Sequence, residues 1–443
     1  MTTPARAAAL AIWRAALAAG DVGPLVRVAL RRDADVLQTP RSRIDLARIH
    51  RVIVIGCGKA GAPMAAATEA ILGDRVDAGF VVVKDGYRAP TRVVEVVEAG
   101  HPVPDERGEA AAHRLLEIAG SAGPDDLVLF LVSGGGSALT PAPVAGVTLA
   151  EKQMVTRLLL GTGATINELN AVRKHLSRLK GGQLARAVAP ARVVTLALSD
   201  VVGDPLDVIA SGPTAPDPTT YADAVRVLTR HGVLEAVPRA VRGHLHAGVR
   251  GELAETPKPG DPVWERVENV IIGNNSLIAE AAVSEAKRLG FRADLLTRHL
   301  EGEAREVARD LVQRARRTQP PACVIAAGET TVTVRGRGRG GRCQELALAA
   351  ALEIGLNEPL TLLAAGTDGT DGPTDAAGAV VDARTAHGDD GALTGARAAL
   401  DDNDSYAFLS ARGDLIVSGP TNTNLLDLYI ALHTPASETS EAL

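Results

Sequence analysis

Short, uninterrupted apolar runs alternate with helix-like segments along this chain of 443 residues, and this alternation constrains the fold more than any other feature. Strands that are apolar throughout, rather than at every second residue, are typical of parallel sheets covered by helices on both faces. The pattern predicts an α/β fold whose ligands gather beyond the carboxyl ends of the strands. The predicted strands are Arg51–Ile55, Gly79–Val83, Leu127–Val132 and Arg192–Leu198, with helices between them at Ala60–Leu72 and Ala110–Ile118.

One polar, proline-rich stretch divides the alternation into two regions. It reads "GELAETPKPGDPVWE" and runs from Gly251 to Glu265. Because the length also favours two domains, we expect an N-terminal domain over 1–250 and a linker over 251–268. The C-terminal segment, 269–443, then holds a second α/β domain with its core at about 322–435.

Two helices have predicted ends. Thr148 and Glu151 form a capping box at the start of one helix. The pattern over Ile166–Gly182 predicts another that is closed by glycine. The first residues, Met1–Asp21, predict a surface helix packed on the domain, with a transit peptide as the alternative.

Composition narrows the function classes. The net charge of −6 argues against a mainly electrostatic nucleic-acid binder. Three widely spaced cysteines form neither a disulfide framework nor a zinc motif. No apolar run approaches the length of a membrane span. We therefore expect a cytoplasmic protein without nucleic-acid or membrane partners.

A first glycine loop follows the strand at Arg51–Ile55. Gly56, Gly58 and Gly61 spell the G-x-G-x-x-G dinucleotide fingerprint between a strand and a helix. Its expected acid is poorly matched, because Asp85 lies 29 residues beyond Gly56 rather than about 20. Lys59, at a helix start, favours a bound anion; a tight turn with a solvated lysine is the alternative.

A second glycine loop follows the strand at Leu127–Val132. Glycine runs let backbone amides approach a ligand closely, which favours a phosphate cradle. A P-loop motif and a G-x-S-x-G nucleophile elbow are both absent from the sequence, and a plain turn is the alternative. The loop consists of Ser133, Gly134, Gly135, Gly136 and Ser137.

Carboxylates follow the strand at Arg192–Leu198. Asp200 and Asp204 lie in one loop, with Asp207 behind them. Mg²⁺ binds through a few carboxylates together with phosphate oxygens, so these two residues are candidate metal ligands. Asx-turns and helix caps are the alternative.

The C-terminal region contributes a predicted phosphate clamp. Glu329 ends an apolar strand, and an arginine-rich loop then leads through Gly341 into a helix that begins near Arg342. Arginine can grip two phosphate oxygens at once, whereas a nucleic-acid-binding RG segment is disfavoured by the shortness of the tract. Asp368 and Asp371 follow in "GTDGTDG", where each is a metal ligand, a proton acceptor or part of a turn.

Together, two glycine loops, a lysine, an arginine and several carboxylates at strand ends predict phosphoryl transfer, which needs positioning and charge neutralisation. Lys59 and Arg342 would neutralise the transferred group, and an acid would orient the acceptor hydroxyl.

Long strings carry a family resemblance through nearly the whole chain. They include "GCGKAG", "AGHPVPDE", "LVSGGGSAL", "NAVRKHLSRLKGGQLA", "LSDVVGDPLDVIASGPTAPDPTT", "AGETTV", "GGRCQELALA", "AAGTDGTDGPTDAAGA" and "SGPTNTNLLDLYIAL". In these the sequence resembles the type-2 glycerate kinases, which combine a DUF4147 domain with a C-terminal MOFRL domain. The resemblance implies a larger N-terminal Rossmann-like parallel domain, a smaller C-terminal domain and an active site in the cleft between them.

The resemblance also implies an activity and its residues. It implies an ATP-dependent kinase that uses Mg²⁺ to convert D-glycerate to 2-phosphoglycerate. A homodimer is a separate expectation for the assembly. The family's key lysine falls on Lys59 and its arginine on Arg342, and Lys180 in "RLKGG" joins the binding residues. Its acids fall on Asp200, Asp204, Glu329, Asp368 and Asp371.

Two rivals stay open. An NAD(P)H-dependent hydroxypyruvate reductase would use the dinucleotide fingerprint but gives no reason for the second glycine loop or for the arginine. A non-catalytic nucleotide or sugar-acid sensor would not need paired acids with a lysine and an arginine.

Overall fold

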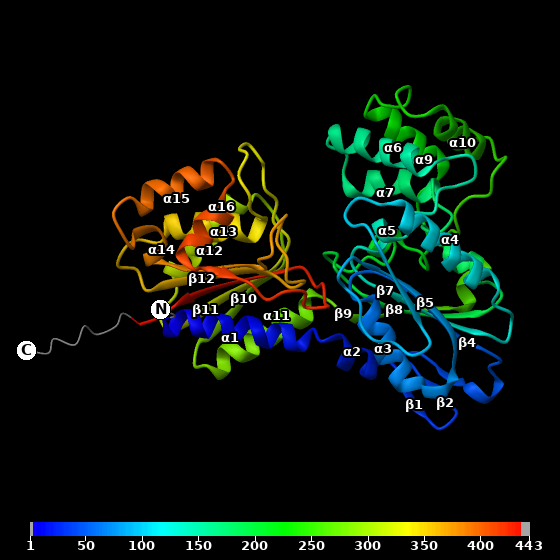
Figure 1. Cartoon of the computed structure of the whole chain (residues 1–443), viewed down its shortest axis with the longest axis horizontal. Helices are drawn as coiled ribbons and strands as arrows, with labels where there is room; N and C mark the ends of the chain where they lie inside the picture. Colours follow the sequence, from blue (N-terminus) through cyan, green and yellow to red (C-terminus); the bar gives the residue numbers. More distant parts are fainter. Residues whose placement is uncertain (1–2, 436–443) are drawn as a thin grey trace, which may run out of the picture. The chain divides into compact units, whose positions relative to one another are not determined.

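The structure is a computed structural model that describes residues 3–435. The chain forms two compact units (Figure 1). The N-terminal unit is Val22–Ile272, and the C-terminal unit combines the residues up to Asp21 with those from Gly273 onward.

The N-terminal unit is built on a six-stranded sheet with the order β6-β5-β4-β7-β8-β9. The pairs from β6 to β8 are parallel, as the apolar runs predict. A separate sheet, β1-β2-β3, is antiparallel. The strands are β1 (Arg31–Asp33), β2 (Val36–Gln38), β3 (Arg43–Asp45), β4 (Val52–Cys57), β5 (Val76–Lys84), β6 (Glu95–Ala99), β7 (Leu127–Val132), β8 (Arg192–Leu198) and β9 (Val267–Gly273).

Helices flank this sheet and also form a group of their own (Figure 1). The group consists of α6, α7, α9 and α10, which share an apolar core that includes Leu159, Val172, Leu228 and Leu245. The helices of the unit are α2 (Val22–Ala29), α3 (Gly61–Leu72), α4 (Glu106–Gly120), α5 (Gly136–Leu139), α6 (Leu149–Gly161), α7 (Ile166–His175), α8 (Gln183–Val188), α9 (Tyr221–Arg230) and α10 (Arg239–Val249).

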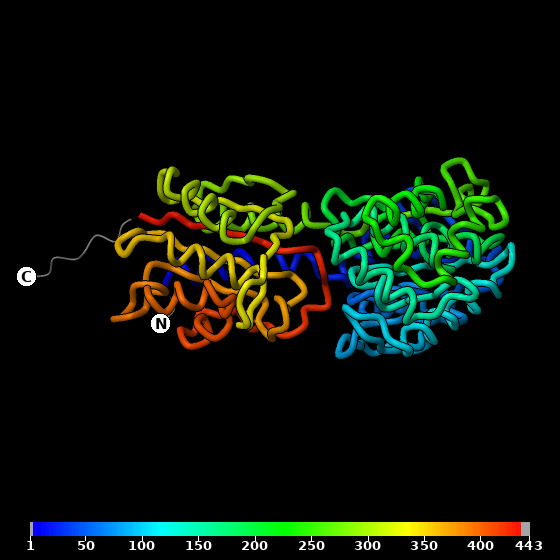
Figure 2. Tube along the Cα trace, turned by 90° about the horizontal axis from the view of Figure 1, so that it is seen from above, coloured from blue at the N-terminus to red at the C-terminus, as the bar shows by residue number. Residues whose placement is uncertain are grey.

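The C-terminal unit has a mixed sheet with the order β10-β11-β15-β12-β13-β14. Its last strand, β15, runs antiparallel between β11 and β12, and Figure 2 shows this red segment between the yellow-green and orange parts of the unit. The elements are α1 (Pro4–Ala19), α11 (Asn275–Arg288), β10 (Arg292–Leu300), α12 (Ala304–Arg316), β11 (Ala322–Gly328), α13 (Arg342–Glu353), β12 (Leu360–Gly366), β13 (Gly378–Asp382), α14 (Ala383–His387), α15 (Ala392–Asp401), α16 (Ser405–Arg412), β14 (Leu415–Ile416) and β15 (Asp427–His433).

The first helix belongs to the C-terminal unit, which differs from the division expected from the sequence. The apolar face of α1 packs against α11. Arg6 forms buried ion pairs with Asp382, at 2.7 Å, and with Asp414. Residues 4–29 have the length and composition of a membrane span, but they are two helices, and Ile12 and Trp13 of α1 are buried.

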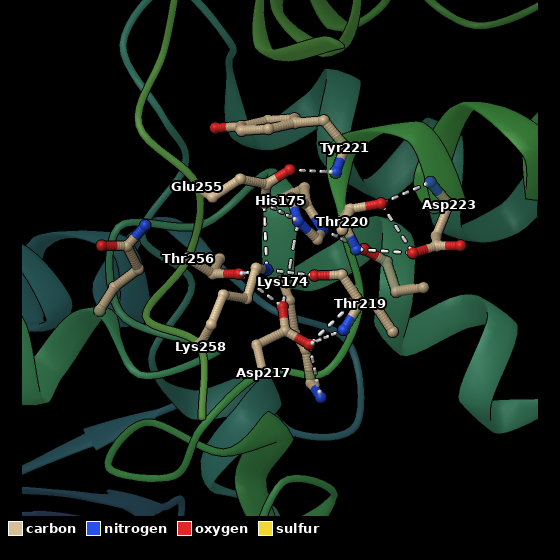
Figure 3. Close-up of polar contacts among 12 residues, drawn as sticks. Lys174, His175, Asp217, Thr219, Thr220, Tyr221, Asp223, Glu255, Thr256 and Lys258 are labelled. Carbon is tan, nitrogen blue, oxygen red and sulfur yellow. Dashed lines mark hydrogen bonds and ion pairs between the residues drawn. The ribbon is translucent and has the colours of Figure 1, made fainter. Parts of the chain in front are cut away.

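The expected linker is docked on the N-terminal unit, and the boundary between the units lies at the end of β9. Figure 3 shows how polar side chains hold this segment. Glu255 accepts hydrogen bonds from the amide of Tyr221 at 2.9 Å and lies 3.1 Å from Nε2 of His175. Thr256 donates to Asp217 at 2.9 Å. The polar, proline-rich sequence predicted a linker, and its partners could not be foreseen because they are remote in sequence.

The helix predicted over Ile166–Gly182 is shorter in the structure. Its capping box at Thr165 starts α7, but α7 ends at His175 and α8 starts at Gln183. Lys174 and His175 are buried among the polar groups of Figure 3. The chain leaves the helix there because those contacts outweigh the local helical pattern.

Candidate active site

Three neighbouring parallel strands bring the predicted loops of the N-terminal unit to one sheet edge. β4 pairs with β7, and β7 pairs with β8. Cys57 lies opposite Val132, and Val132 lies opposite Ala197. The first glycine loop, the second glycine loop and the loop carrying Asp200 therefore start side by side.

The first glycine loop is locked onto the second. The amide of Lys59 donates to the carbonyl of Gly134 at 2.9 Å, and the amide of Ala60 donates to Oγ of Ser133 at 2.9 Å. Gly58, at φ +129°, donates to Val82 and lies so close to Ser133 that any Cβ would clash. These amides are used within the protein, so the loop offers a phosphate the side chain of Lys59 rather than a backbone cradle.

The first glycine of the dinucleotide fingerprint and its candidate acid both have other roles in the structure. A Cβ on Gly56 would lie 2.6 Å from the carbonyl oxygen of Leu131, so this glycine serves the packing of β4 on β7. Asp85 forms two hydrogen bonds with Arg107, at 2.7 and 2.8 Å, on the surface. The geometry therefore weighs against a dinucleotide at this loop.

The second glycine loop keeps amides available. The amides of Gly134, Gly135 and Ser137 donate to no backbone carbonyl within residues 3–435. Gly135 adopts φ +85°, a conformation that glycine tolerates best. A Cβ on Gly136 would lie 2.8 Å from Sγ of Cys57, so the run is held close to β4.

Ser137 sits at the centre of a cationic group. Its hydroxyl accepts from Nη2 of Arg173 at 2.6 Å and lies 3.0 Å from Oγ of Ser211. Its carbonyl accepts from Nζ of Lys180 at 2.8 Å. Ser137, Arg173 and Lys180 line a cavity of about 420 Å³ that Lys152 also lines. Ser137 and Lys180 are two of the binding residues named from the sequence.

Lys152 and Arg173 were missed. Lys152 occupies an inward-facing position of α6 between the buried Leu149 and Val155, where an apolar residue is the norm. A lysine at an apolar position of the helical pattern is the sequence signal that could have indicated this cluster of cations. Arg173 gives no such signal, because it lies in an ordinary run of basic residues at the end of α7.

The carboxylates after β8 are the predicted metal ligands of the N-terminal unit. Asp200 and Asp204 share the loop that leaves β8, and Asp204 adopts φ +56°. Within the described residues, no group of three or more His, Cys, Asp or Glu side chains could hold a metal ion. Mg²⁺ commonly binds to one or two carboxylates and completes its shell with phosphate oxygens and water, which these two residues fit.

The C-terminal unit places Arg342 between two carboxylates. Its guanidinium binds both oxygens of Asp427, at 2.5 and 3.0 Å, and lies 2.6 Å from Oε1 of Glu329. Burial opposes the charge, but Asp427 and Glu329 raise the pKa of Arg342 above its ordinary value. Asp427 starts β15 opposite Gly328 and Gly366, and sequence reasoning assigned it no role.

Asp371 caps the helix that Arg342 begins. Its carboxylate accepts from the amide of Cys343 at 3.2 Å and from the amide and side chain of Gln344 at 2.9 and 3.1 Å. A Cβ on Gly341 would clash with this carboxylate, so the glycine permits the approach. The contacts favour a structural role for Asp371 over the predicted metal ligand.

The remaining predicted residues lie around the same helix start. Oδ1 of Asp368 accepts from the amide of Thr370 at 3.0 Å, which is a turn contact. The arginine-rich loop is held by the turn after α15: Asn403 accepts from the amides of Arg335 and Gly336 at 2.8 and 2.9 Å.

Replacing Asp371 tests the capping role. Burial and the nearby Asp427 raise the pKa of Asp371 to about 7, although the amides of Gln344 and Cys343 oppose the rise. Asp371→Ala removes every acceptor and should lower the free energy of unfolding by about 2 kcal/mol. Asp371→Asn keeps an acceptor oxygen and should unfold close to the wild type in a denaturant titration.

Because the pKa of Asp371 is raised, the difference in unfolding free energy between the wild type and Asp371→Asn should depend on pH. A carboxyl group whose pKa is higher when folded stabilises the fold most at low pH, and this contribution is lost as pH rises towards 7 and above. The free energy of unfolding of the wild type should therefore fall, relative to Asp371→Asn, by about 1 kcal/mol between pH 6 and 8. An Asn variant that is stable but needs far more Mg²⁺ for half-maximal activity would instead support a metal ligand.

Two family models match the chain. The model described as a domain of unknown function, DUF4147, matches residues 8–246, and that of the MOFRL family matches residues 322–427. Both fall within the regions of α/β alternation described above.

Curated relatives and a solved structure extend along most of the chain. It is 44% identical over 392 residues to "Glycerate 2-kinase" of Pyrococcus horikoshii, covering 87% of this chain and 88% of that protein. It is 42% identical over 391 residues to a "Putative hydroxypyruvate reductase" of Agrobacterium vitis, covering 86% and 87%. The crystal structure of a glycerate kinase from Thermotoga maritima matches with a TM-score of 0.82 at 41% identity, covering 96% of this chain and 99% of that one.

Proposed function

We propose that this chain, which belongs to the type-2 glycerate kinase family, transfers the terminal phosphoryl group of ATP to the 2-hydroxyl of D-glycerate with the help of Mg²⁺. The family is given by the paired DUF4147 and MOFRL matches and by relatives that cover most of both chains. The donor, the metal and the position of phosphorylation are the further content of the proposal.

One observation carries the proposal from the geometry. Lys59, Arg173 and Lys180 gather at the second glycine loop, whose amides at Gly134, Gly135 and Ser137 donate to no backbone carbonyl in the described chain. Cations and oriented amides in a partly buried site stabilise charge that moves between oxygens. This is what phosphoryl transfer requires.

The residues divide the work by their chemistry. The stem of Lys59 lies against Gly135, where a Cβ would be 3.6 Å from Cγ of Lys59, so we assign this lysine to the phosphoryl group at this loop. Asp200 and Asp204 would hold Mg²⁺, which shields the charge of the phosphates when it is bound. We also assign a binding role to Arg342 of the C-terminal unit, whose guanidinium group Asp427 orients.

The reductase reading has less support. A hydride transfer from a dinucleotide needs the first glycine loop to cradle a pyrophosphate, but its amides already donate to Val82, Ser133 and Gly134. Asp85, the candidate ribose ligand, is paired with Arg107. Two relatives from Agrobacterium vitis are called putative hydroxypyruvate reductases, so the reductase assay is the competing test.

One assay tests the proposal and its metal together. Purified protein with Mg·ATP and D-glycerate should form 2-phosphoglycerate and ADP, which phosphorus NMR distinguishes from 3-phosphoglycerate. Excess EDTA should abolish turnover, and added Mg²⁺ should restore it. Oxidation of NADH or NADPH with hydroxypyruvate, without phosphoglycerate formation from ATP, would overturn the proposal.

A further inference from the structure

The cavity beside Ser137 combines apolar walls with a cluster of cations. We call it the cation pocket; it measures about 420 Å³ and lies wholly within the N-terminal unit. Its apolar side chains come from the segment before α4 and from α6 and α7, and they include Val103, Leu149, Leu160 and Leu169. Its clustered cations are Lys152, Arg173 and Lys180, and the exposed Arg157 also lines it.

The three cations lack negative partners. Lys152 is 7% exposed, and its Nζ has no hydrogen-bond partner. Lys180 is 1% exposed and its Nζ donates to the carbonyl of Ser137, and Arg173 donates to the hydroxyl of the same residue. None of the three forms an ion pair with an acid of residues 3–435. Buried charges without a counter-ion are costly, so the arrangement favours an anionic ligand.

The lysines also act on each other. Burial, followed by the neighbouring Arg173, lowers the pKa of Lys152 to about 7. Burial, followed by Lys152 and Arg173, lowers the pKa of Lys180 well below its ordinary value. A bound anion would reverse these effects by favouring the charged ammonium groups.

We propose that the cation pocket binds the nucleoside polyphosphate donor, with the base against Val103, Leu149 and Leu169 and the phosphates on Lys152, Arg173 and Lys180. The inference rests on the proposed kinase activity and places the nucleotide, one of its two substrates, in the cation pocket. Oxygens of a phosphate chain would share the donors of Arg173 and the ammonium groups of both lysines.

Charge and size favour the nucleotide over glycerate in this pocket. Glycerate carries a single carboxylate, which would leave two of three clustered cations uncompensated. Its three carbons carry polar groups and would leave the apolar walls in contact with water. A nucleoside triphosphate has several negative charges at one end and a flat base at the other, as the pocket requires.

Calorimetry with the full chain tests the assignment. The probes are the Mg²⁺ complex of a non-hydrolysable ATP analogue and inorganic tripolyphosphate. Lys152→Met replaces the unpartnered ammonium with an apolar group of similar length, and we expect it to weaken binding of the analogue by about 10- to 100-fold. The matched control is Lys287→Met, the same change at an exposed position of α11, which should bind the analogue like the wild type.

Two further measurements guard against trivial effects. Lys152→Met removes a buried, unpaired charge, so the unliganded variant should melt at the same temperature as the wild type or higher. Tripolyphosphate should bind more weakly than the analogue, because it cannot use the apolar wall. Equal affinities would overturn the assignment of the base.

The outcomes separate this inference from the proposed function. A Lys152→Met enzyme with unchanged nucleotide affinity but a raised KM for glycerate would overturn the nucleotide assignment and leave the kinase intact. Conversely, an enzyme that binds the analogue through Lys152 but makes no phosphoglycerate would contradict the proposed function and support the pocket.

Discussion

The Lys59→Met variant is expected to lose kcat for glycerate phosphorylation by about a thousandfold, because a positioned cation at a developing oxyanion contributes on this scale. The loop that presents Lys59 is fixed by backbone contacts that do not use its side chain, namely the amides of Lys59 and Ala60 on Gly134 and Ser133. The thermal unfolding transition should therefore stay close to that of the wild type.

The measurement is steady-state kinetics with Mg·ATP and D-glycerate. Lys287→Met, exposed on α11, is the matched control and should retain the wild-type kcat. A loss confined to KM would indicate that Lys59 binds the ground state and the transition state equally. Near-normal kcat and KM in Lys59→Met would remove this residue from the mechanism.

Asp217→Ala is expected to give the largest loss of stability, about 3–5 kcal/mol in the free energy of unfolding. Asp217 is fully buried and lies 3.3 Å from Nζ of the buried Lys174 (Figure 3). It also accepts from the hydroxyls of Thr219 and Thr256 at 2.7 and 2.9 Å. The substitution leaves the two hydroxyl donors without this acceptor. Lys174 then keeps one carboxylate neighbour, Asp207, whose Oδ2 lies 3.1 Å from Nζ.

Asp223→Ala is the control for this experiment. It removes a carboxylate from the capping box of α9, in the same region but at a more exposed position, and should cost about 1 kcal/mol. Urea titrations followed by circular dichroism give both values. If the midpoint of Asp217→Ala equals that of Asp223→Ala, the buried pair does not stabilise the unit as argued.

Elements buried on both faces were predictable from the sequence. The predicted strands Leu127–Val132 and Arg192–Leu198 coincide with β7 and β8. An uninterrupted apolar run of this length is typical of a strand that helices cover on both faces of a parallel sheet. The start of α13 at Arg342 follows from the glycines before it. The two-domain α/β fold is confirmed by the two sheets and by the similar glycerate kinase structures.

Contacts between remote segments were not predictable. Asp427 holds Arg342 from 85 residues away, and neither residue's neighbours in the sequence indicate the other. Lys152 and Arg173 join Lys180 only because α6, α7 and the turn after α7 meet at Ser137. The local strings predicted which loops carry charge, whereas the partners of each charge depend on tertiary packing.

The docked segment after α10 decides where the N-terminal unit can be cut. A fragment ending at residue 250 would lose Glu255, which accepts from the amide of Tyr221 and contacts His175, and Thr256, which donates to Asp217. His175 lies two residues after Arg173 at the end of α7, so the truncation would loosen the wall of the cation pocket. Expression of this half as a separate protein should therefore continue to Ile272, where the compact unit ends.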